Sequence, residues 1–264
     1  MKKIDYHIHS SFSADSQASI EEYIHEAILR DLDEICFTDH YDINYPEIEF
    51  ILDIPSYFTE LTQLKEKYQS KINIKIGIEI GLDPNYKSEI VNIINSYPFD
   101  FVIGSIHVIN NTEFIHPGDY FKGKSKIEAH KEYFDHVLKC VQLFDCFDVL
   151  GHLDYIERYG PYESNKINER LFTPLIDEIL RTLISKNKGI EVNTSGFLLM
   201  ERQFAFPSLA IIQRYYDLGG KVITIGTDSH DKKRIGENVD RIMELLQNIG
   251  FKEVSTYTKR KIDS

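Results

Sequence analysis

The sequence has few cysteines and no long apolar run. Its three cysteines, Cys36, Cys140 and Cys146, have neither the even count of a disulfide framework nor the C-x-x-C spacing of a zinc ribbon. No apolar segment approaches the roughly 20 residues that cross a bilayer. The residues after Met1 lack the apolar stretch and small-residue cleavage site of a signal peptide. We therefore expect a cytoplasmic protein with reduced cysteines and no membrane partner.

Basic residues are also in short supply. The chain has 30 Lys and Arg against 42 Asp and Glu, which gives a formal net charge of -12. Nonspecific binding to nucleic acid depends on clustered basic side chains that neutralise phosphates, so this composition disfavours a nucleic-acid partner. An anionic substrate would have to be attracted by a local positive site.

The order of predicted elements indicates the fold class. A chain of 264 residues with 42% hydrophobic residues can build one large core, and α/β barrels of this length occur as one domain, here residues 1–264. Amphipathic helical stretches separate short β-rich runs, a pattern typical of βα units around a parallel sheet. The predicted strands are Lys3-His7, Glu34-Thr38, Ile72-Ile80, Phe99-Ile106, Phe147-Gly151, Gly189-Asn193 and Lys221-Gly226.

Two helices begin with a recognisable capping box, in which Ser is followed by Glu three residues later. These are Ser19 with Glu22 and Ser125 with Glu128. Other helices are predicted near 56–69, 87–96, 168–187, 207–218 and 237–249. His130 and His136, in the helix after Ser125, are expected at the surface.

Potential metal ligands recur where predicted strands run into loops. Six of the ten histidines are placed in this way, together with several carboxylates. A core has little use for six imidazoles, whereas divalent metals bind neutral imidazole and carboxylate directly. In a parallel barrel the carboxyl ends of all strands gather on one face, so these side chains are expected to converge there. The candidate ligands are His7, His9, Asp15, His40, Glu79, His107, His152, Asp228 and His230.

The motifs around these residues resemble the polymerase and histidinol phosphatase superfamily, known as PHP, and within it the histidinol-phosphate phosphatase branch. The similar segments follow the family's order over most of the chain. They are Asp5-Tyr6-His7-Ile8-His9-Ser10, Thr38-Asp39-His40-Tyr41-Asp42, Gly77-Ile78-Glu79-Ile80-Gly81, Asp100-Phe101-Val102-Ile103-Gly104-Ser105-Ile106-His107, Gly151-His152-Leu153-Asp154, Glu191-Val192-Asn193-Thr194-Ser195-Gly196 and Gly226-Thr227-Asp228-Ser229-His230.

The resemblance implies a distorted seven-stranded βα barrel, similar to a TIM barrel, with three divalent metal ions. It assigns His7, His9, Glu79 and Asp228 to one metal, His107 and His152 with the bridging Glu79 to a second, and Asp15, His40 and His230 to a third. Many family members have histidine where this chain has Asp15, which makes the third site richer in oxygen. Zinc, iron and manganese all suit such ligands.

The activity that the resemblance implies is hydrolysis of a small phosphomonoester, L-histidinol phosphate, in histidine biosynthesis. A hydroxide bridging two metals would attack phosphorus, with Asp228 orienting and deprotonating it and His230 assisting indirectly. Arginine forks grip phosphate oxygens in pairs, and the resemblance favours Arg158 and Arg202 for this role, with Arg158 also acting in catalysis. His116 is a further candidate for contact with the substrate.

Other activities are compatible with parts of the pattern. A PHP-type protein-tyrosine phosphatase or other phosphoesterase would share the metal motifs, whereas the acidic composition disfavours a DNA exonuclease. An amidohydrolase barrel also begins with H-x-H, but it commonly uses a bridging lysine where this chain has Glu79. A non-catalytic metal-binding protein would have filled coordination spheres and no pocket.

Overall fold

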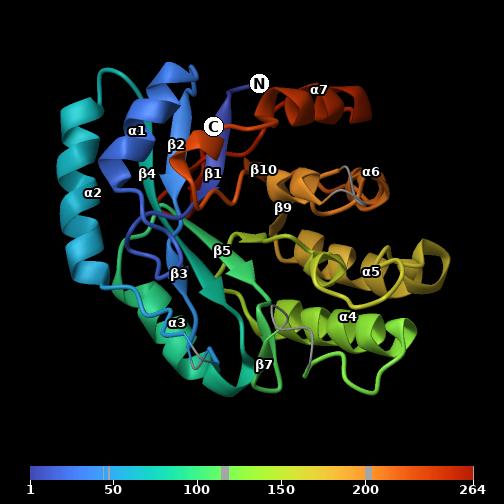
Figure 1. The fold of residues 1–264 in the computed structure, drawn as a ribbon. Helices are drawn as coiled ribbons and strands as arrows, with labels where there is room; N and C mark the ends of the chain where they lie inside the picture. The colour runs from blue at the N-terminus through green and yellow to red at the C-terminus, as the bar shows by residue number, and fades with distance from the viewer. Residues whose placement is uncertain (44, 47, 114–118, 200–203, 264) are drawn as a thin grey trace.

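The computed structural model describes residues 1–43, 45–46, 48–113, 119–199 and 204–263. Its centre is a parallel sheet that curves into a nearly closed barrel (Figure 1). The strands follow each other around the barrel in the order β1 (Ile4–Ile8), β2 (Glu34–Phe37), β4 (Asn73–Gly81), β5 (Phe101–Ser105), β8 (Val149–Leu150), β9 (Gly189–Asn193) and β10 (Ile223–Gly226). The short strand β3 (His40–Tyr41) also pairs with β4. The predicted seven-stranded α/β barrel is confirmed.

The seam between β1 and β10 closes at the carboxyl ends of the two strands. Ile8 and Ser229 form a parallel bridge there. The amide of Asp228 donates to the carbonyl oxygen of His7 at 2.9 Å, and the amide of His9 donates to that of Ser229 at 3.0 Å. The residues that join the two ends of the sheet are thus the predicted metal ligands or their direct neighbours.

The helices lie outside the barrel, with α1, α2 and α3 on one side in Figure 1 and α4 to α7 on the other. Both predicted capping boxes are present, at Ser19 with Glu22 and at Ser125 with Glu128. The helices are α1 (Ile20–Leu29), α2 (Ile54–Tyr68), α3 (Lys87–Ser96), α4 (Lys126–Leu143), α5 (Glu169–Ser185), α6 (Leu209–Asp217) and α7 (Val239–Ile249), with short 3-10 helices at η1 (Pro84–Tyr86), η2 (Tyr155–Arg158), η3 (Thr194–Leu198) and η4 (Lys232–Arg234).

The strands are apolar because both of their faces are covered. All five residues of β1 are buried, and so are all five of β9. A parallel sheet with helices outside and side chains inside leaves no solvated face, so its strands do not alternate between polar and apolar residues. This explains how Glu79 can be fully buried near the carboxyl end of the isoleucine-rich β4.

A hairpin of β11 (Tyr257–Thr258) and β12 (Lys261–Ile262) covers the end of the barrel where the strands begin. Lys75 Nζ donates to Thr258 Oγ1 at 2.7 Å, and Arg260 Nε pairs with Asp148 Oδ2. The amide of Tyr257 donates to the hydroxyl of Tyr6 inside the barrel at 3.0 Å. A second hairpin, β6 (Val108–Ile109) with β7 (Thr112–Glu113), follows β5.

The expected surface position of His130 is wrong. Its side chain is 0% exposed and lies against the ring of Phe172, at 6.1 Å between ring centroids. Ile127, an apolar residue near the start of the same helix, is 51% exposed. The inward face of α4 therefore includes a histidine that a hydrophobicity pattern assigns to solvent.

Within the described ranges, every helix is too short or too polar to traverse a bilayer.

Candidate metal centre

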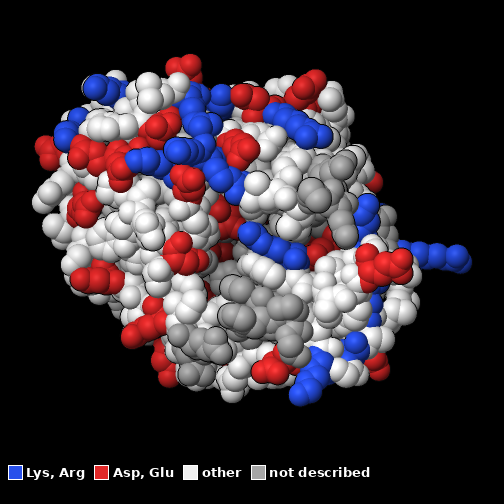
Figure 2. Space-filling model, viewed as in Figure 1, with Lys and Arg blue, Asp and Glu red and all other residues white. Residues whose placement is uncertain are grey.

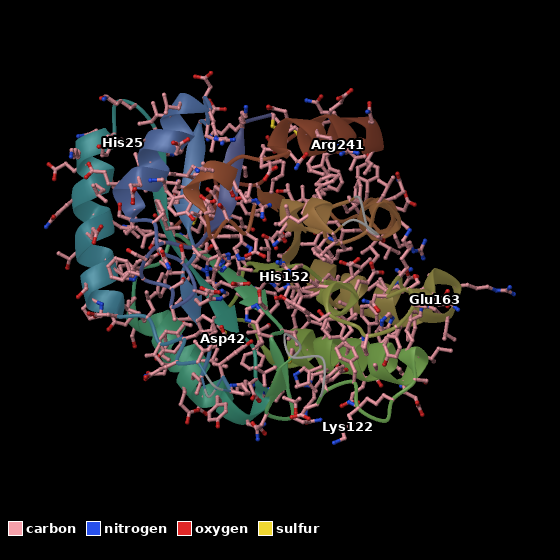
Figure 3. The ribbon with its side chains drawn as sticks, viewed as in Figure 1. His25, Asp42, Lys122, His152, Glu163 and Arg241 are labelled. Carbon is pink, nitrogen blue, oxygen red and sulfur yellow. The ribbon has the colours of Figure 1, made fainter. Side chains whose placement is uncertain are left out.

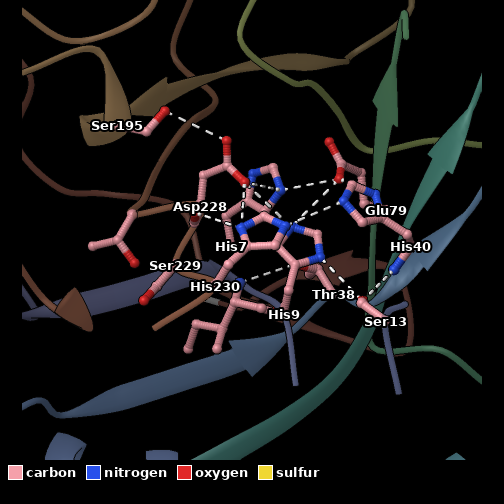
Figure 4. Close-up of polar contacts among 12 residues, drawn as sticks. His7, His9, Ser13, Thr38, His40, Glu79, Ser195, Asp228, Ser229 and His230 are labelled. Carbon is pink, nitrogen blue, oxygen red and sulfur yellow. Dashed lines mark hydrogen bonds and ion pairs between the residues drawn. The ribbon is translucent and has the colours of Figure 1, made fainter. Parts of the chain in front are cut away.

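The predicted ligands converge at the carboxyl ends of the strands. His7 is in β1 and His9 directly follows it, His40 is in β3, and Glu79 is in β4. His107 follows β5, His152 follows β8, and Asp228 and His230 follow β10. Asp15 lies in the loop between β1 and α1. Figure 4 shows polar contacts of His7, His9, His40, Glu79, Asp228 and His230.

Glu79 is the centre of the cluster, because its two carboxylate oxygens face ring nitrogens from five histidines. Glu79 Oε2 lies 3.2 Å from His7 Nε2, 3.5 Å from His9 Nε2 and 2.9 Å from His40 Nδ1, and Glu79 Oε1 lies 3.3 Å from His107 Nε2 and 3.1 Å from His152 Nε2. Ser105 donates a hydrogen bond of 2.6 Å to Oε1, which helps to fix the carboxylate. One carboxylate thus lies between two groups of imidazoles, as a bridging ligand would.

Several of these atoms are buried without a hydrogen-bond partner among the described residues. They include His7 Nε2, His9 Nε2, His40 Nδ1 and Glu79 Oε2. An unsatisfied buried polar atom costs roughly 1–3 kcal/mol, so a cluster of them is unfavourable unless something binds there. Imidazole nitrogen and carboxylate oxygen are ordinary ligands of divalent transition metals. The donor set therefore fits the metal ions that the sequence predicts.

Ligand atoms that could share one ion fall into overlapping groups, each with all its atoms within 4.8 Å of one another. One group contains His7, His9 and Glu79, and another contains Glu79, His107 and His152. These match the first two predicted sites, apart from Asp228. Its Oδ1 lies 3.3 Å from His9 Nε2 and 3.6 Å from His7 Nε2, so Asp228 borders the first group.

The side chains predicted for the third site also lie close together. His9, His40 and His230 form one of the groups, and the ring of His9 stacks on the other two at centroid distances of 4.0 and 4.2 Å. Asp15 Oδ2 lies 3.1 Å from His230 Nε2 and 3.6 Å from His40 Nε2. Burial raises the pKa of Asp15, but His230 and His40 outweigh this and lower it to about 2. Asp15 therefore offers an anionic oxygen where it was predicted.

Asp228 links the ligand cluster to the neighbouring polar residues. Its backbone has φ 54°, a left-handed conformation that aspartate tolerates better than most residues. While Oδ1 faces the histidines, Oδ2 accepts hydrogen bonds from Asn193 Nδ2 at 3.3 Å and Ser195 Oγ at 3.4 Å. Arg158 Nη1 lies 3.8 Å from the same oxygen. Asp228 thus connects the histidines to the arginine predicted to bind phosphate.

Two carboxylates outside the predicted set of site residues support the predicted ligands. Glu191 Oε1 lies 2.5 Å from His7 Nδ1, and its Oε2 accepts from the amide of His152 at 2.9 Å. Asp42 Oδ1 lies 2.9 Å from His107 Nδ1. Such partners fix the orientation of metal-binding histidines. Both had a signal in the sequence: Glu191 is an acid in a buried apolar strand, and Asp42 is two residues after His40.

Asp39 organises the loop that follows β1. Its carboxylate accepts hydrogen bonds from the amide of Ser10 at 2.7 Å and from the hydroxyl of Ser13 at 2.7 Å. Burial raises the pKa of Asp39 to about 6 in spite of these bonds. The amide of His40 donates to Ser13 Oγ at 3.0 Å, so the same network also fixes a predicted ligand.

A cavity of about 340 Å³ opens above the cluster, lined by ligands, by aromatic residues and by Arg158 and Arg234. Arg158 Nη1 donates to Ser195 Oγ at 3.2 Å, and Arg234 Nε pairs with Glu237 at 2.9 Å.

In Figure 3, His152 and Asp42 lie near the middle of the molecule, whereas Lys122 and Glu163 are peripheral. Basic and acidic residues are mixed over this side of the surface (Figure 2). Arg202 and His116 fall outside the described residues, so their predicted contacts stay predictions.

The fold and the site together define a βα-barrel protein with a cluster of histidines and carboxylates able to bind metal at its carboxyl face, and comparisons with known proteins agree. The PHP domain family matches residues 5–195. The histidinol-phosphatase of Lactococcus lactis is 43% identical over 263 residues, which cover 100% of this chain and 97% of that protein. A relative from Clostridium acetobutylicum, described as "Probable histidinol-phosphatase", is 36% identical over 251 residues, 95% of each chain.

The similarity extends to three dimensions. The crystal structure of the Lactococcus lactis histidinol phosphate phosphatase, complexed with zinc, L-histidinol and phosphate, superposes with a TM-score of 0.94. The two chains are 43% identical, and the superposition covers 100% of this chain and 99% of the other. The chain belongs to the PHP domain family, in its histidinol-phosphatase branch. The resemblance stated from the motifs is confirmed.

Proposed function

We propose that this protein is a metal-dependent histidinol-phosphatase that hydrolyses L-histidinol phosphate to L-histidinol and phosphate. The observation that carries the proposal is the position of Glu79 between two groups of histidines, on the floor of a cavity that also contains Arg158. The relatives named histidinol-phosphatase, and the neighbouring structure with L-histidinol and phosphate, support this choice of substrate. Residues 1–264 would act as one catalytic unit.

Three divalent ions are proposed as cofactors. One ion would be held by His7, His9, Glu79 and Asp228. A second would be held by Glu79, His107 and His152, and a third by Asp15, His40 and His230. When bound, such ions neutralise negative charge on a phosphoryl group and make water more acidic. The zinc in the neighbouring structure supports zinc, and the same ligands suit iron or manganese.

Arg158 is proposed to hold the phosphoryl group. The cavity wall fixes its guanidinium through Ser195 and places it 5.8 Å and 5.6 Å from the rings of Tyr155 and Tyr159. A fixed planar fork can donate two hydrogen bonds to two phosphate oxygens, and it loses little freedom on binding. Its positive charge also offsets the repulsion expected from a chain with net charge -12. Arg202 and His116 remain predicted substrate contacts.

Asp228 is proposed to accept the proton of the attacking water. Burial raises the pKa of Asp228, but the surrounding histidines, His7 foremost, outweigh burial and hold it well below its usual value, so the carboxylate stays anionic. As the water oxygen bonds to phosphorus, the bond from phosphorus to the ester oxygen breaks, and the leaving alkoxide takes up one proton to become the alcohol, which balances the proton that water passed to Asp228. His230 is proposed to assist by positioning, because its Nδ1 lies 3.1 Å from the carbonyl of Asp228.

The geometry disfavours the amidohydrolase alternative. Such barrels commonly bridge their metals with a lysine, whereas here a fully buried glutamate, Glu79, occupies the position between the two groups of histidines. The proposed partner is a small phosphomonoester. A cytoplasmic location stays a prediction.

The direct test is a comparison of substrates with purified, metal-loaded protein. We expect release of phosphate from L-histidinol phosphate with a kcat/KM at least a hundredfold above that for a phosphotyrosine peptide. Protein treated with a chelator and then desalted serves as the control and should be inactive. Equal or higher efficiency on the phosphotyrosine peptide would replace this proposal with a protein-tyrosine phosphatase, and absence of any phosphatase activity would refute it.

A further inference from the structure

The aromatic rings that line the described part of the cavity fall into two pairs. Tyr155 and Tyr159 form the first pair, with their hydroxyl oxygens 3.0 Å apart. The ring of Tyr155 stacks on His152 at a centroid distance of 4.2 Å and an interplanar angle of 28°. The guanidinium of Arg158 lies over both tyrosines. This pair therefore supports a predicted ligand and the arginine proposed to bind phosphate.

The second pair, Tyr45 and Phe50, lies in the loop that follows β3. Their ring centroids are 4.9 Å apart at an interplanar angle of 90°, so the edge of one ring faces the other. Phe50 is also tilted against His40 at 4.9 Å. It is only 5% exposed, yet it lines the cavity together with the half-buried Tyr45.

The main chain fixes this aromatic pair relative to the metal centre. Asp42 and Phe50 form an antiparallel bridge in which the amide of Asp42 donates to the carbonyl oxygen of Phe50 at 2.8 Å. The carboxylate of Asp42 in turn holds His107. The bridge thus ties the backbone of Phe50 to the residue that holds His107.

We infer that Tyr45 and Phe50 form the subsite for the imidazole ring of the substrate. This inference rests on the proposed function, because it concerns the leaving alcohol of that reaction. With the phosphoryl group held between Arg158 and the cluster, the rest of the ester occupies the remaining cavity. Imidazole is planar and aromatic, and such rings stack on one ring face and meet another edge-on, with an energy that depends on geometry. Two aromatic rings at right angles provide both surfaces.

A subsite of this kind affects selectivity more than chemistry, because it contacts a part of the substrate that does not react. The test compares L-histidinol phosphate with O-phosphoethanolamine, which has the phosphate ester and the amine but no ring. In Tyr45→Leu, kcat/KM for L-histidinol phosphate should fall about three- to tenfold, mainly through KM. The value for O-phosphoethanolamine should stay within twofold. Tyr41→Leu, in the same segment but not lining the cavity, is the matched control and should leave both unchanged.

Binding of L-histidinol, measured by calorimetry with the metal-loaded protein, tests the subsite without turnover. Tyr45→Leu should weaken this binding by the same three- to tenfold. Phe50→Leu should weaken the binding of L-histidinol to the same extent. Because Phe50 also contacts His40, the effect of this variant on turnover is judged by the ratio of kcat/KM for L-histidinol phosphate to kcat/KM for O-phosphoethanolamine. If the protein binds L-histidinol through Tyr45 but hydrolyses neither ester, the subsite stands and the proposed function fails.

Four results would overturn the inference. Tyr45→Leu could reduce turnover of both esters equally, which would make its role structural. It could leave both turnover and L-histidinol binding unchanged. The parent protein could also hydrolyse O-phosphoethanolamine as efficiently as L-histidinol phosphate, or fail to bind L-histidinol, and a site for the ring would then be absent.

Discussion

The carboxylate of Glu191 lies 2.5 Å from His7 Nδ1, although the two residues belong to strands on different sides of the barrel seam. This contact places the hydrogen of the imidazole on Nδ1, so Nε2 carries its lone pair into the cluster. Burial alone would lower the pKa of His7, but Glu191, Glu79 and Asp228 together raise it well above its usual value. Without metal these carboxylates favour a protonated His7, and a bound cation takes the place of the Nε2 proton.

Replacing Glu191 with glutamine should weaken metal binding. The amide keeps the size of the side chain and can still accept a hydrogen bond, but it removes the negative charge that makes His7 a strong ligand. Loss of such a partner typically costs ten- to a hundredfold in metal affinity or activity. Zinc titration of the metal-free parent and variant measures the affinity. An affinity within twofold of the parent would mean that Glu191 only orients the ring.

Glu79→Gln should be more damaging than a single-atom change suggests. In the parent protein, nitrogens from five histidines face the one carboxylate of Glu79. A neutral amide in its place cannot bridge two cations. We expect kcat to fall by at least a hundredfold and the metal content to fall by at least one ion per chain, with circular dichroism unchanged. Near-normal turnover together with normal metal content would exclude the bridging role.

The isolated protein should contain two to three metal ions per chain, a number that follows from nine ligands with one bridging carboxylate. Prolonged chelation should abolish activity, and adding back zinc or manganese should restore it. Elemental analysis of protein prepared without chelators checks the number. Active protein with less than one ion per chain would contradict the whole assignment.

Arg158→Met should impair the use of substrate without disturbing the fold. Methionine keeps much of the aliphatic length but removes the charged fork, and loss of a charge-assisted contact costs roughly 1.5–3 kcal/mol. This corresponds to about ten- to a hundredfold in kcat/KM for L-histidinol phosphate. Arg202→Met is expected to have a similar effect. Arg181→Met, at an exposed position on α5, is the matched control. Values within twofold of the parent for both Arg158→Met and Arg202→Met would remove arginine from phosphate binding.

His130 should make the protein sensitive to acid. Burial, with a smaller effect from Lys126, lowers the pKa of His130 to about 4, and both ring nitrogens have no partner among the described residues. The unfolded chain, with a pKa near 6.5, binds the proton more readily, so stability is complete above pH 6.5 and falls as the pH drops towards 4. The loss from this residue is at most about 3 kcal/mol.

Urea unfolding between pH 7 and pH 4 checks this expectation by comparing the parent protein with His130→Leu. The metal ligands titrate in both proteins, so the difference in the free energy of unfolding isolates His130. The variant should lose less stability on acidification than the parent. Parallel curves would show that His130 finds a partner for its proton.

The sequence predicted the barrel well because each strand is a local apolar run that ends in a polar residue. β9 has the predicted bounds, Gly189–Asn193, since burial on both faces leaves an uninterrupted signal. The convergence of His7 with Glu79 followed from the topology alone, because parallel strands end on one face. These predictions needed no knowledge of which side chains touch.

The remaining features depend on distances that only the folded chain defines. Glu191 and Glu79 are both acids in buried strands. Nothing in the local sequence distinguishes a carboxylate that lies between two groups of histidines from one that contacts the Nδ1 atom of a single histidine. Asp42 directly follows β3, a strand of only two residues beside the longer β4, and its partner His107 is distant in sequence. His130 was assigned to the surface because a hydrophobicity pattern treats every histidine as polar.

The closure of the barrel at its ligand-bearing seam has a consequence for the order of assembly. His7 and His9 are synthesised more than two hundred residues before Asp228 and Ser229, which bond to their backbone. The first proposed metal site therefore cannot be complete before Asp228 has been made, although His7, His9 and Glu79 precede it in the chain. Metal loading must accompany or follow the final closure of the sheet. An ion bound there would link the two strands across the seam, so hydrogen exchange of the amides of His9 and Asp228 should slow when it binds.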